Sequence, residues 1–230
     1  MLILALETST ENGSCALWRD GAIIERACPA GRPHSETLLP LVRELMDEAG
    51  IGFGRLDGIA FGAGPGAFTG LRIACGIAQG LAAAAGKPVV PVCGLEALAA
   101  GSGAPRAVAL LDARMSEVYG AAYVADGNGG WRLDGEIVVS PPDAVPLPAG
   151  GDWVAVGNGA AAYAALAARL SGAGIPLVEP AWPTAALVAT VGARVLARGA
   201  GIDPALAAPL YVRDKVAKTV AERLAEGGRA

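Results

Sequence analysis

The sequence predicts an α/β protein with two related lobes, each built on a mixed β-sheet. The chain opens with three short apolar or alternating runs separated by turn signals, and then alternates between helical and strand patterns. After residue 103 a second set of three runs begins, followed by a shorter strand and helix series. Because the same order occurs twice, we expect a lobe of residues 1–103 and a smaller, degenerate lobe of residues 104–230.

The first lobe is expected to start as a meander. Its three runs cover residues 2–7, 14–19 and 22–28, and the turn signals between them are Asn12-Gly13 and Asp20-Gly21. Apolar residues at helical spacing then predict a helix over about 35–49, with Pro40 in its first turns. The expected elements that follow are a strand over 56–61, a helix ending near 85, a strand over 88–92 and a short helix over 94–100.

The second lobe is expected to follow a Gly-Ser-Gly-Ala-Pro boundary at residues 101–105. Its meander is expected at residues 107–111, 117–124 and 130–139, and a proline-rich loop follows at 141–152. A strand is expected at 153–156 and two helices at 160–170 and 184–198.

A glycine-rich turn lies between the strand at 56–61 and the long helix after it. Residues 61–73 read FGAGPGAFTGLRI, and Thr69 can cap the helix. A strand, turn and helix of this kind often bind phosphate. No Lys follows Gly70, so the Walker pattern is not met. The GAGPGA run resembles the dinucleotide fingerprint, but residues 87–93 hold no acid for a ribose. A tight turn that packs helix on sheet is favoured over a nucleotide site.

The composition of the chain argues against several classes of protein. The 230-residue chain is 53% hydrophobic, with a mean hydropathy of +0.45 and a net charge of −4. It has no basic surplus of the kind that proteins binding nucleic acid on their own carry. The most apolar stretch, residues 71–86, is interrupted by Arg72 and Gln79 and is judged too short to span a membrane. The start of the chain lacks the basic residues of a signal peptide, so we expect a cytoplasmic protein.

Four segments together resemble one protein family. They are residues 4–10 (LALETST), 64–73 (GPGAFTGLRI), 112–119 (DARMSEVY) and 209–213 (PLYVR). These segments are similar, in the same order, to motifs of the bacterial TsaB family of tRNA threonylcarbamoyladenosine biosynthesis proteins. The resemblance implies an actin-like, sugar-kinase-like ATPase fold with two RNase H-like lobes.

The resemblance also implies a role without catalysis. TsaB members are partners of TsaD, which transfers threonylcarbamoyl from an adenylate to the adenosine 3′ of the anticodon; a separate synthase makes the adenylate, and the ATPase TsaE completes the machinery. ATP and metal are implied for that complex and not for this chain alone, and contact with tRNA is expected only indirectly. The alternatives are an independent ATP-hydrolysing enzyme of the same fold and, less favoured, a metallopeptidase.

Few residues are candidates for chemistry. The catalytic paralogue holds its metal through His-x-x-x-His, whereas the single histidine here, His34, is followed at that spacing by Leu38. We expect His34 to start a helix. The four cysteines form no Cys-x-x-Cys pair. Residues Thr8, Ser9 and Thr10 are weak candidates for a phosphate-binding hairpin, and a polar strand end satisfied by hydrogen bonds is the favoured interpretation.

The partner surface is expected on the helices at about 35–49 and 69–85. In the second helix Gly76 and Gly80 share one face, although each costs about 0.8–1.0 kcal/mol against Ala. The family pairs these helices with those of TsaD, and a homodimer could use the same surface. The alternative is that these faces pack on the protein's own sheet. The expected interface residues are Leu38, Val42, Leu45, Met46, Arg72, Gly76, Gly80 and Ala83. We expect Gly80→Leu and Met46→Glu to leave the chain folded and to weaken the complex.

Overall fold

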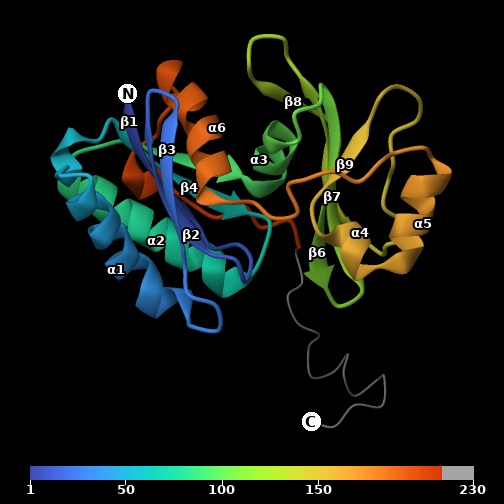
Figure 1. Ribbon diagram of the computed structural model, residues 1–230, viewed down its shortest axis with the longest axis horizontal. Coiled ribbons are helices and arrows are strands. Elements are labelled where there is room, and N and C mark those ends of the chain that lie inside the picture. Colours follow the sequence, from blue (N-terminus) through green and yellow to red (C-terminus); the bar gives the residue numbers. More distant parts are fainter. Residues whose placement is uncertain (214–230) are drawn as a thin grey trace, which may run out of the picture.

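The computed structural model describes residues 1–213 as two α/β lobes side by side (Figure 1). The first lobe has a sheet of five strands in the order β3-β2-β1-β4-β5. β1 pairs antiparallel with β2 and parallel with β4, so the sheet is mixed as expected. The strands are β1 (Leu2–Glu7), β2 (Ser14–Arg19), β3 (Ala22–Ala27), β4 (Gly58–Gly64) and β5 (Val89–Cys93).

Helices cover both faces of this sheet: α1 (His34–Glu48) and α2 (Phe68–Ala85) on one, α6 (Ala185–Ala197) on the other. The side chains of β1 alternate between the two faces. Leu4 and Leu6 pack with α1 and α2, whereas Ile3 and Ala5 pack with α6. The unbroken apolar run of β1 is therefore explained by burial on both sides.

The helix α6 differs from the expected division of the chain. Its residues fall in the range 104–230, which the sequence assigned to the second lobe, yet α6 packs on the first sheet. A Cβ added to Gly192 would lie 2.6 Å from the Cβ of Ala60 on β4. After α6, the amide of Val89 on β5 donates to the carbonyl of Ile202 at 2.9 Å. Residues 214–230 of the expected second lobe lie outside the described residues.

The second sheet repeats the plan of the first in shortened form. Its strands are β6 (Arg106–Arg114), β7 (Glu117–Ala125), β8 (Trp131–Ser140) and β9 (Val154–Val156), in the order β8-β7-β6-β9. β6 occupies the place of β1, because it pairs antiparallel with β7 and parallel with β9. The fifth position holds only an isolated parallel bridge between Ala155 and Leu177.

Helices also flank this second sheet. The helix α3 (Gly94–Gly101) covers one face, and α4 (Gly159–Ala162) and α5 (Ala164–Gly172) cover the other. α3 also contacts α6, so these two helices lie between the sheets. The single helix expected over 160–170 is divided at Tyr163, whose φ of −135° is extended.

The helix α2 is longer than the apolar stretch considered in the sequence. It has 18 residues with a mean hydropathy of 1.3, and by length and composition it could cross a membrane. A third of it is buried inside the protein. Core helices of soluble proteins meet the same criteria, so one such helix is a weak indication.

Candidate functional site

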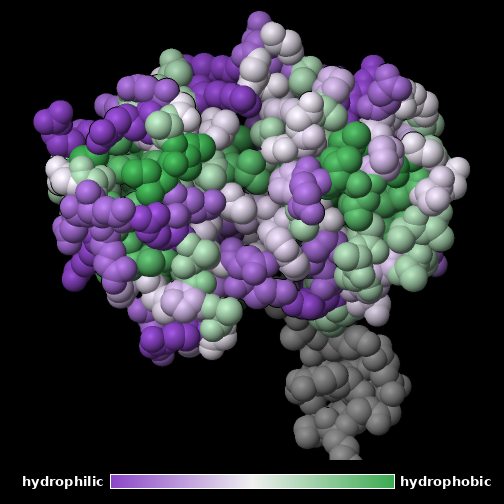
Figure 2. Space-filling model, viewed as in Figure 1, coloured by the Kyte–Doolittle hydropathy of each residue, from purple (hydrophilic) through white to green (hydrophobic). Residues whose placement is uncertain are grey.

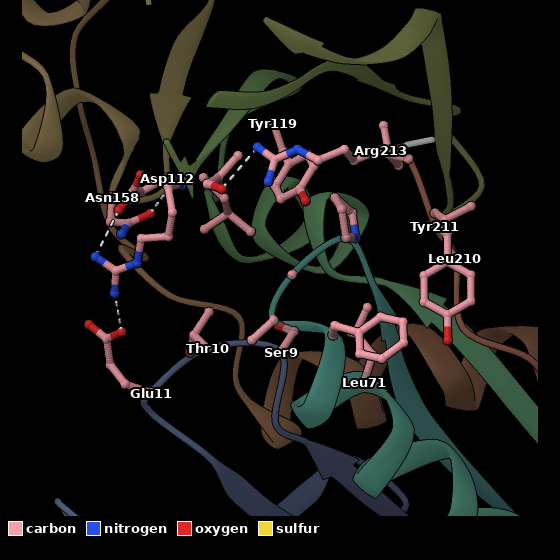
Figure 3. A pocket seen from close by; sticks show the side chains of 18 of the residues that line it. Ser9, Thr10, Glu11, Leu71, Asp112, Tyr119, Asn158, Leu210, Tyr211 and Arg213 are labelled. Carbon is pink, nitrogen blue, oxygen red and sulfur yellow. Dashed lines mark hydrogen bonds and ion pairs between the residues drawn. The ribbon is translucent and has the colours of Figure 1, made fainter. Parts of the chain in front are cut away.

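A cavity of about 300 Å³ lies between the lobes (Figure 3). The β1–β2 hairpin, the N-terminus of α2, the β6–β7 turn and residues 210–213 meet there. On the face seen in Figure 2, hydrophilic and near-neutral residues are mixed at the junction of the two lobes. The polar side chains that line the cavity are Ser9, Thr10, Glu11, Asp112, Arg114, Asn158 and Arg213, and the large, mainly apolar ones are Phe68, Leu71, Leu111, Met115, Tyr119, Trp182, Leu210 and Tyr211.

The β1–β2 hairpin packs directly on the glycine turn. The carbonyl of Ser9 accepts a hydrogen bond from the amide of Ala67 at 2.8 Å, and the Oγ1 of Thr8 donates to the carbonyl of Gly70 at 2.7 Å. A Cβ on Gly70 would lie 1.8 Å from the carbonyl oxygen of Thr8, and one on Gly66 would lie 2.4 Å from that of Ser9. Glycine is required here because two backbones approach closely. The prediction of a tight packing turn is confirmed.

The expected cap of α2 is wrong. The helix starts at Phe68, its N-cap residue is Ala67, and no side chain caps it. Thr69 lies inside the first turn. The Ser9 carbonyl, which comes from the other motif, satisfies the amide of Ala67 instead. A contact between segments distant in the sequence has replaced the local cap.

Glu7 ends β1 with a fully buried carboxyl group. Its Oε1 accepts a hydrogen bond from the amide of Ser9, and its Oε2 has no partner. Burial raises the pKa of Glu7 to about 7, against the lowering effect of the Ser9 hydrogen bonds. A Cβ on Gly62 would lie 1.9 Å from Oε2, so the carboxyl group packs against the glycine strand. Glu7 is not among the residues that line the cavity.

The three weak candidates for a phosphate-binding hairpin differ in their contacts. Of the three weak candidates, Thr8 is buried and its hydroxyl is bonded to Gly70. Ser9 is buried beside the cavity with an unpartnered Oγ, and Thr10 lines the cavity and accepts from the amide of Asn12. One amide at the start of α2, that of Ala67, is already bonded to the Ser9 carbonyl. Within residues 1–213 no three His, Cys, Asp or Glu side chains are grouped to hold a metal.

The single histidine makes contacts within the fold. His34 is the first residue of α1, as predicted. Its Nε2 lies 2.9 Å from the carbonyl oxygen of Thr10. The ring covers Gly13, where a Cβ would lie 2.6 Å from Cε1 of the imidazole. His34 therefore holds the β1–β2 hairpin against the start of α1.

A polar network forms the second-lobe wall of the cavity. Asp112 Oδ1 accepts from the hydroxyl of Tyr163 and the amide of Arg114, at 2.7 and 2.8 Å. The amide of Asp112 donates to Oδ1 of Asn158 at 2.9 Å. Arg114 then reaches the first lobe, where its Nη2 lies 2.8 Å from a carboxylate oxygen of Glu11 (Figure 3). The sequence marked the Asp112 segment as a motif but gave no sign of Asn158 or Tyr163, which follow in separate elements.

The expected interface residues divide into two groups. Four of them are buried in the core between α1, α2 and the first sheet, so the expectation that they face a partner is wrong: Leu38, Val42, Leu45 and Met46. The apolar arc of α1 is used by the protein's own sheet. The other four lie exposed along α2: Arg72, Gly76, Gly80 and Ala83. A Cβ on Gly76 or Gly80 would meet nothing within 4 Å, so these glycines do not serve internal packing.

Comparisons with known proteins cover most of the chain. A family model described as "TsaD: tRNA N6-adenosine threonylcarbamoyltransferase" matches residues 28–221. The "tRNA threonylcarbamoyladenosine biosynthesis protein TsaB" of Escherichia coli is 38% identical over 226 residues, which are 94% of this chain and 96% of that protein. The chain belongs to the TsaB family. The TsaB of Haemophilus influenzae is also 38% identical, over 77% of this chain and 80% of its own.

A solved structure supports the same assignment. YeaZ from Pseudomonas aeruginosa superposes with a TM-score of 0.79 and 38% identity, covering 91% of this chain and 99% of its own. The actin-like α/β fold expected for TsaB members is thus confirmed, with two mixed sheets of which the second is shortened.

Proposed function

We propose that this chain acts in tRNA threonylcarbamoyladenosine biosynthesis as a non-catalytic subunit that binds and activates TsaD. The observation that carries the proposal is the similarity to Escherichia coli TsaB, which extends over 94% of this chain. TsaD performs the transfer in this proposal, TsaE joins through the complex, and the chain contacts tRNA only indirectly. The protein works in the cytoplasm.

The geometry of the cavity supports a role without phosphate chemistry. The Ser9 carbonyl occupies the start of α2, and the carboxyl group of Glu7 packs against the fold beside Gly62. A phosphoryl-transfer site needs donors and acids that point at the phosphates and their metal. Here these groups are used to join the β1–β2 hairpin to the glycine turn.

The open face of α2 supports the docking role. Arg72, Gly76, Gly80 and Ala83 are exposed, and small residues let another helix approach closely. Because glycine lowers helix stability, two glycines with no internal packing role favour a use outside the chain. We propose that helices of TsaD pack there, and that a homodimer competes for the same face.

An independent ATP-hydrolysing enzyme is the second candidate. The interlobe cavity, with the unpartnered Oγ of Ser9 beside it, is the observation in its favour. The buried Glu7 and the occupied start of α2 weigh against it. A metallopeptidase has no ligand cluster within residues 1–213 to support it.

Reconstitution tests the proposal. Purified chain, alone and with TsaD, TsaE and the adenylate synthase, is assayed for threonylcarbamoyl-modified tRNA. We expect no product from the chain alone, product from the full mixture, and much less when the chain is left out. Modification by the chain without TsaD would contradict the proposal, as would full activity without the chain.

A further inference from the structure

The last described residues cross from the first lobe to the second. The side chain of Gln79 on α2 donates to the carbonyl of Ala207 at 3.2 Å, and the amide of Leu210 donates to the carbonyl of Ala63 on β4 at 2.7 Å. Three residues later Arg213 donates to the carbonyl of Ala113 on β6 at 3.1 Å. Residues 209–213 thus run along the rim of the cavity with an anchor in each lobe (Figure 3).

The first-lobe anchor lies at the N-terminal end of α2. The ring of Tyr211 packs 5.7 Å from that of Phe68, and Nε of Arg72 donates to the Tyr211 hydroxyl at 3.1 Å. The guanidinium of Arg72 also lies 4.0 Å from the centre of the Phe68 ring. The carbonyl oxygen of Leu210 leaves no room for a side chain at Gly64, where a Cβ would lie 2.9 Å away. This end is fixed by backbone, aromatic and charged contacts together.

The second-lobe anchor holds a strained turn. Arg114, Met115 and Ser116 join β6 to β7 with φ values of 60°, 55° and 59°. Such conformations are unfavourable for residues other than glycine, and they persist where surrounding contacts impose them. Arg213 supplies contacts on both sides of the turn, to the carbonyl of Ala113 and to the carboxylate of Glu117.

The Arg213 anchor is better protected from solvent than the Arg114–Glu11 ion pair that joins the lobes across the cavity. Only 16% of the Arg213 side chain is exposed, compared with 71% for Arg114 and 59% for Glu11 in the pair across the cavity. Exposed ion pairs are screened by solvent and contribute little. Hydrogen bonds and ion pairs that are shielded from water are stronger, because the local dielectric constant is lower.

We propose that residues 209–213 are a latch that fixes the orientation of the two lobes and couples the start of α2 to the β6–β7 turn. Each end of the latch is held by an arginine, Arg72 on α2 and Arg213 at the turn, with Tyr211 between them. A disturbance at one end is transmitted to the other, and the coupling is reciprocal. The latch does not depend on the function proposed above.

Hydrogen exchange of the full chain, followed by mass spectrometry, tests the latch. In Arg213→Gln we expect exchange to rise at least fivefold in the first turn of α2, as well as in the β6–β7 turn. The matched control is Arg132→Gln, which removes an exposed arginine paired with Asp134 on β8 of the same lobe. We expect the control to leave α2 unchanged. A rise confined to residues around Arg213 and the β6–β7 turn would overturn the proposal.

The reverse experiment starts from the first lobe and guards against loss of folding. Tyr211→Phe removes only the hydroxyl that accepts from Arg72. We expect exchange in the β6–β7 turn to rise at least threefold, while circular dichroism and the thermal midpoint stay close to those of the parent. If Arg213→Gln fails to fold, this variant decides: an unchanged β6–β7 turn would show that the two ends are not coupled.

Discussion

The carbonyl oxygen of Ser9 accepts a 2.8 Å hydrogen bond from the backbone amide of Ala67, the N-cap residue of α2. This bond joins the first and second family motifs, and it uses the helix terminus that binds phosphate in many strand-turn-helix units. A glycine turn of this shape can therefore bind another part of the chain through its backbone.

We expect the isolated chain to bind Mg-ATP weakly or not at all. The Ser9 carbonyl already occupies the amide of Ala67 at the start of α2, and the Glu7 carboxyl group does not line the cavity. Isothermal titration calorimetry measures the affinity directly. Binding in the micromolar range, with heat released on hydrolysis, would instead favour the ATP-hydrolysing alternative.

Replacing either of two glycines of α2 by alanine should change the free energy of unfolding in opposite directions. Gly70→Ala would place a Cβ 1.8 Å from the Thr8 carbonyl oxygen, so we expect it to lower the free energy of unfolding by about 1–3 kcal/mol. Gly76→Ala meets nothing within 4 Å, and we expect it to raise the free energy of unfolding by up to about 1 kcal/mol. Urea titrations of both variants measure the difference. Equal effects would show that the hairpin does not press on Gly70.

The buried carboxyl group of Glu7 should make stability depend on pH. Its pKa is raised from 4.5 to about 7 in the folded protein, so the folded state binds a proton that the unfolded state has released between these values. The free energy of unfolding therefore falls as pH rises from about 4.5 to about 7, by roughly 3 kcal/mol at one pKa unit per 1.36 kcal/mol. The stability that protonated Glu7 gives is complete below the unfolded pKa and is lost above the folded one.

Glu7→Gln tests this dependence. The glutamine side chain keeps an oxygen that can accept a hydrogen bond from the backbone amide of Ser9, but the side chain cannot ionise. Urea unfolding of parent and variant, at several pH values from about 5 to about 8, should give two curves that converge at low pH and separate as pH rises. Parallel curves would mean that Glu7 does not bind the extra proton.

The variants Gly80→Leu and Met46→Glu, both first expected to stay folded, should now behave differently. Met46 is 2% exposed inside the core, so a carboxylate there should destabilise the protein by several kcal/mol or prevent folding, as measured by circular dichroism and urea titration. Arg43→Glu puts the same side chain on the exposed side of α1 and serves as the control. A stable Met46→Glu would contradict the packing of α1.

Gly80→Leu should leave the protein folded and weaken its association with TsaD. A Cβ at this position would meet nothing within 4 Å, and the leucine side chain would cover part of the face on which we propose that TsaD packs. Gel filtration of the mixture measures complex formation, and Gly172→Leu at the open end of α5 is the matched control. Normal binding by Gly80→Leu would exclude this part of α2 from the interface.

The sequence by itself determined the elements and their order. The turn signal Asp20-Gly21 forms the β2–β3 turn, with both residues at positive φ. The unbroken apolar run of β1 predicts a buried strand and the spacing in α1 identifies an apolar face, because these patterns follow from the local geometry of strand and helix. The family motifs indicated the fold, and His34 starts α1 as expected.

Only the tertiary structure decided what each apolar face meets. The spacing of Met46 and of Gly80 marks a face but cannot say whether the chain's own sheet or a partner covers it. For the same reason the sequence grouped α6 with the second lobe, although α6 packs on the first sheet. It also predicted that Thr69 caps α2, whereas the Ser9 carbonyl accepts the hydrogen bond from the amide of Ala67. Hydrophobic burial and hydrogen bonding act between whichever segments the folded chain brings together, and those partners lie far apart in the sequence.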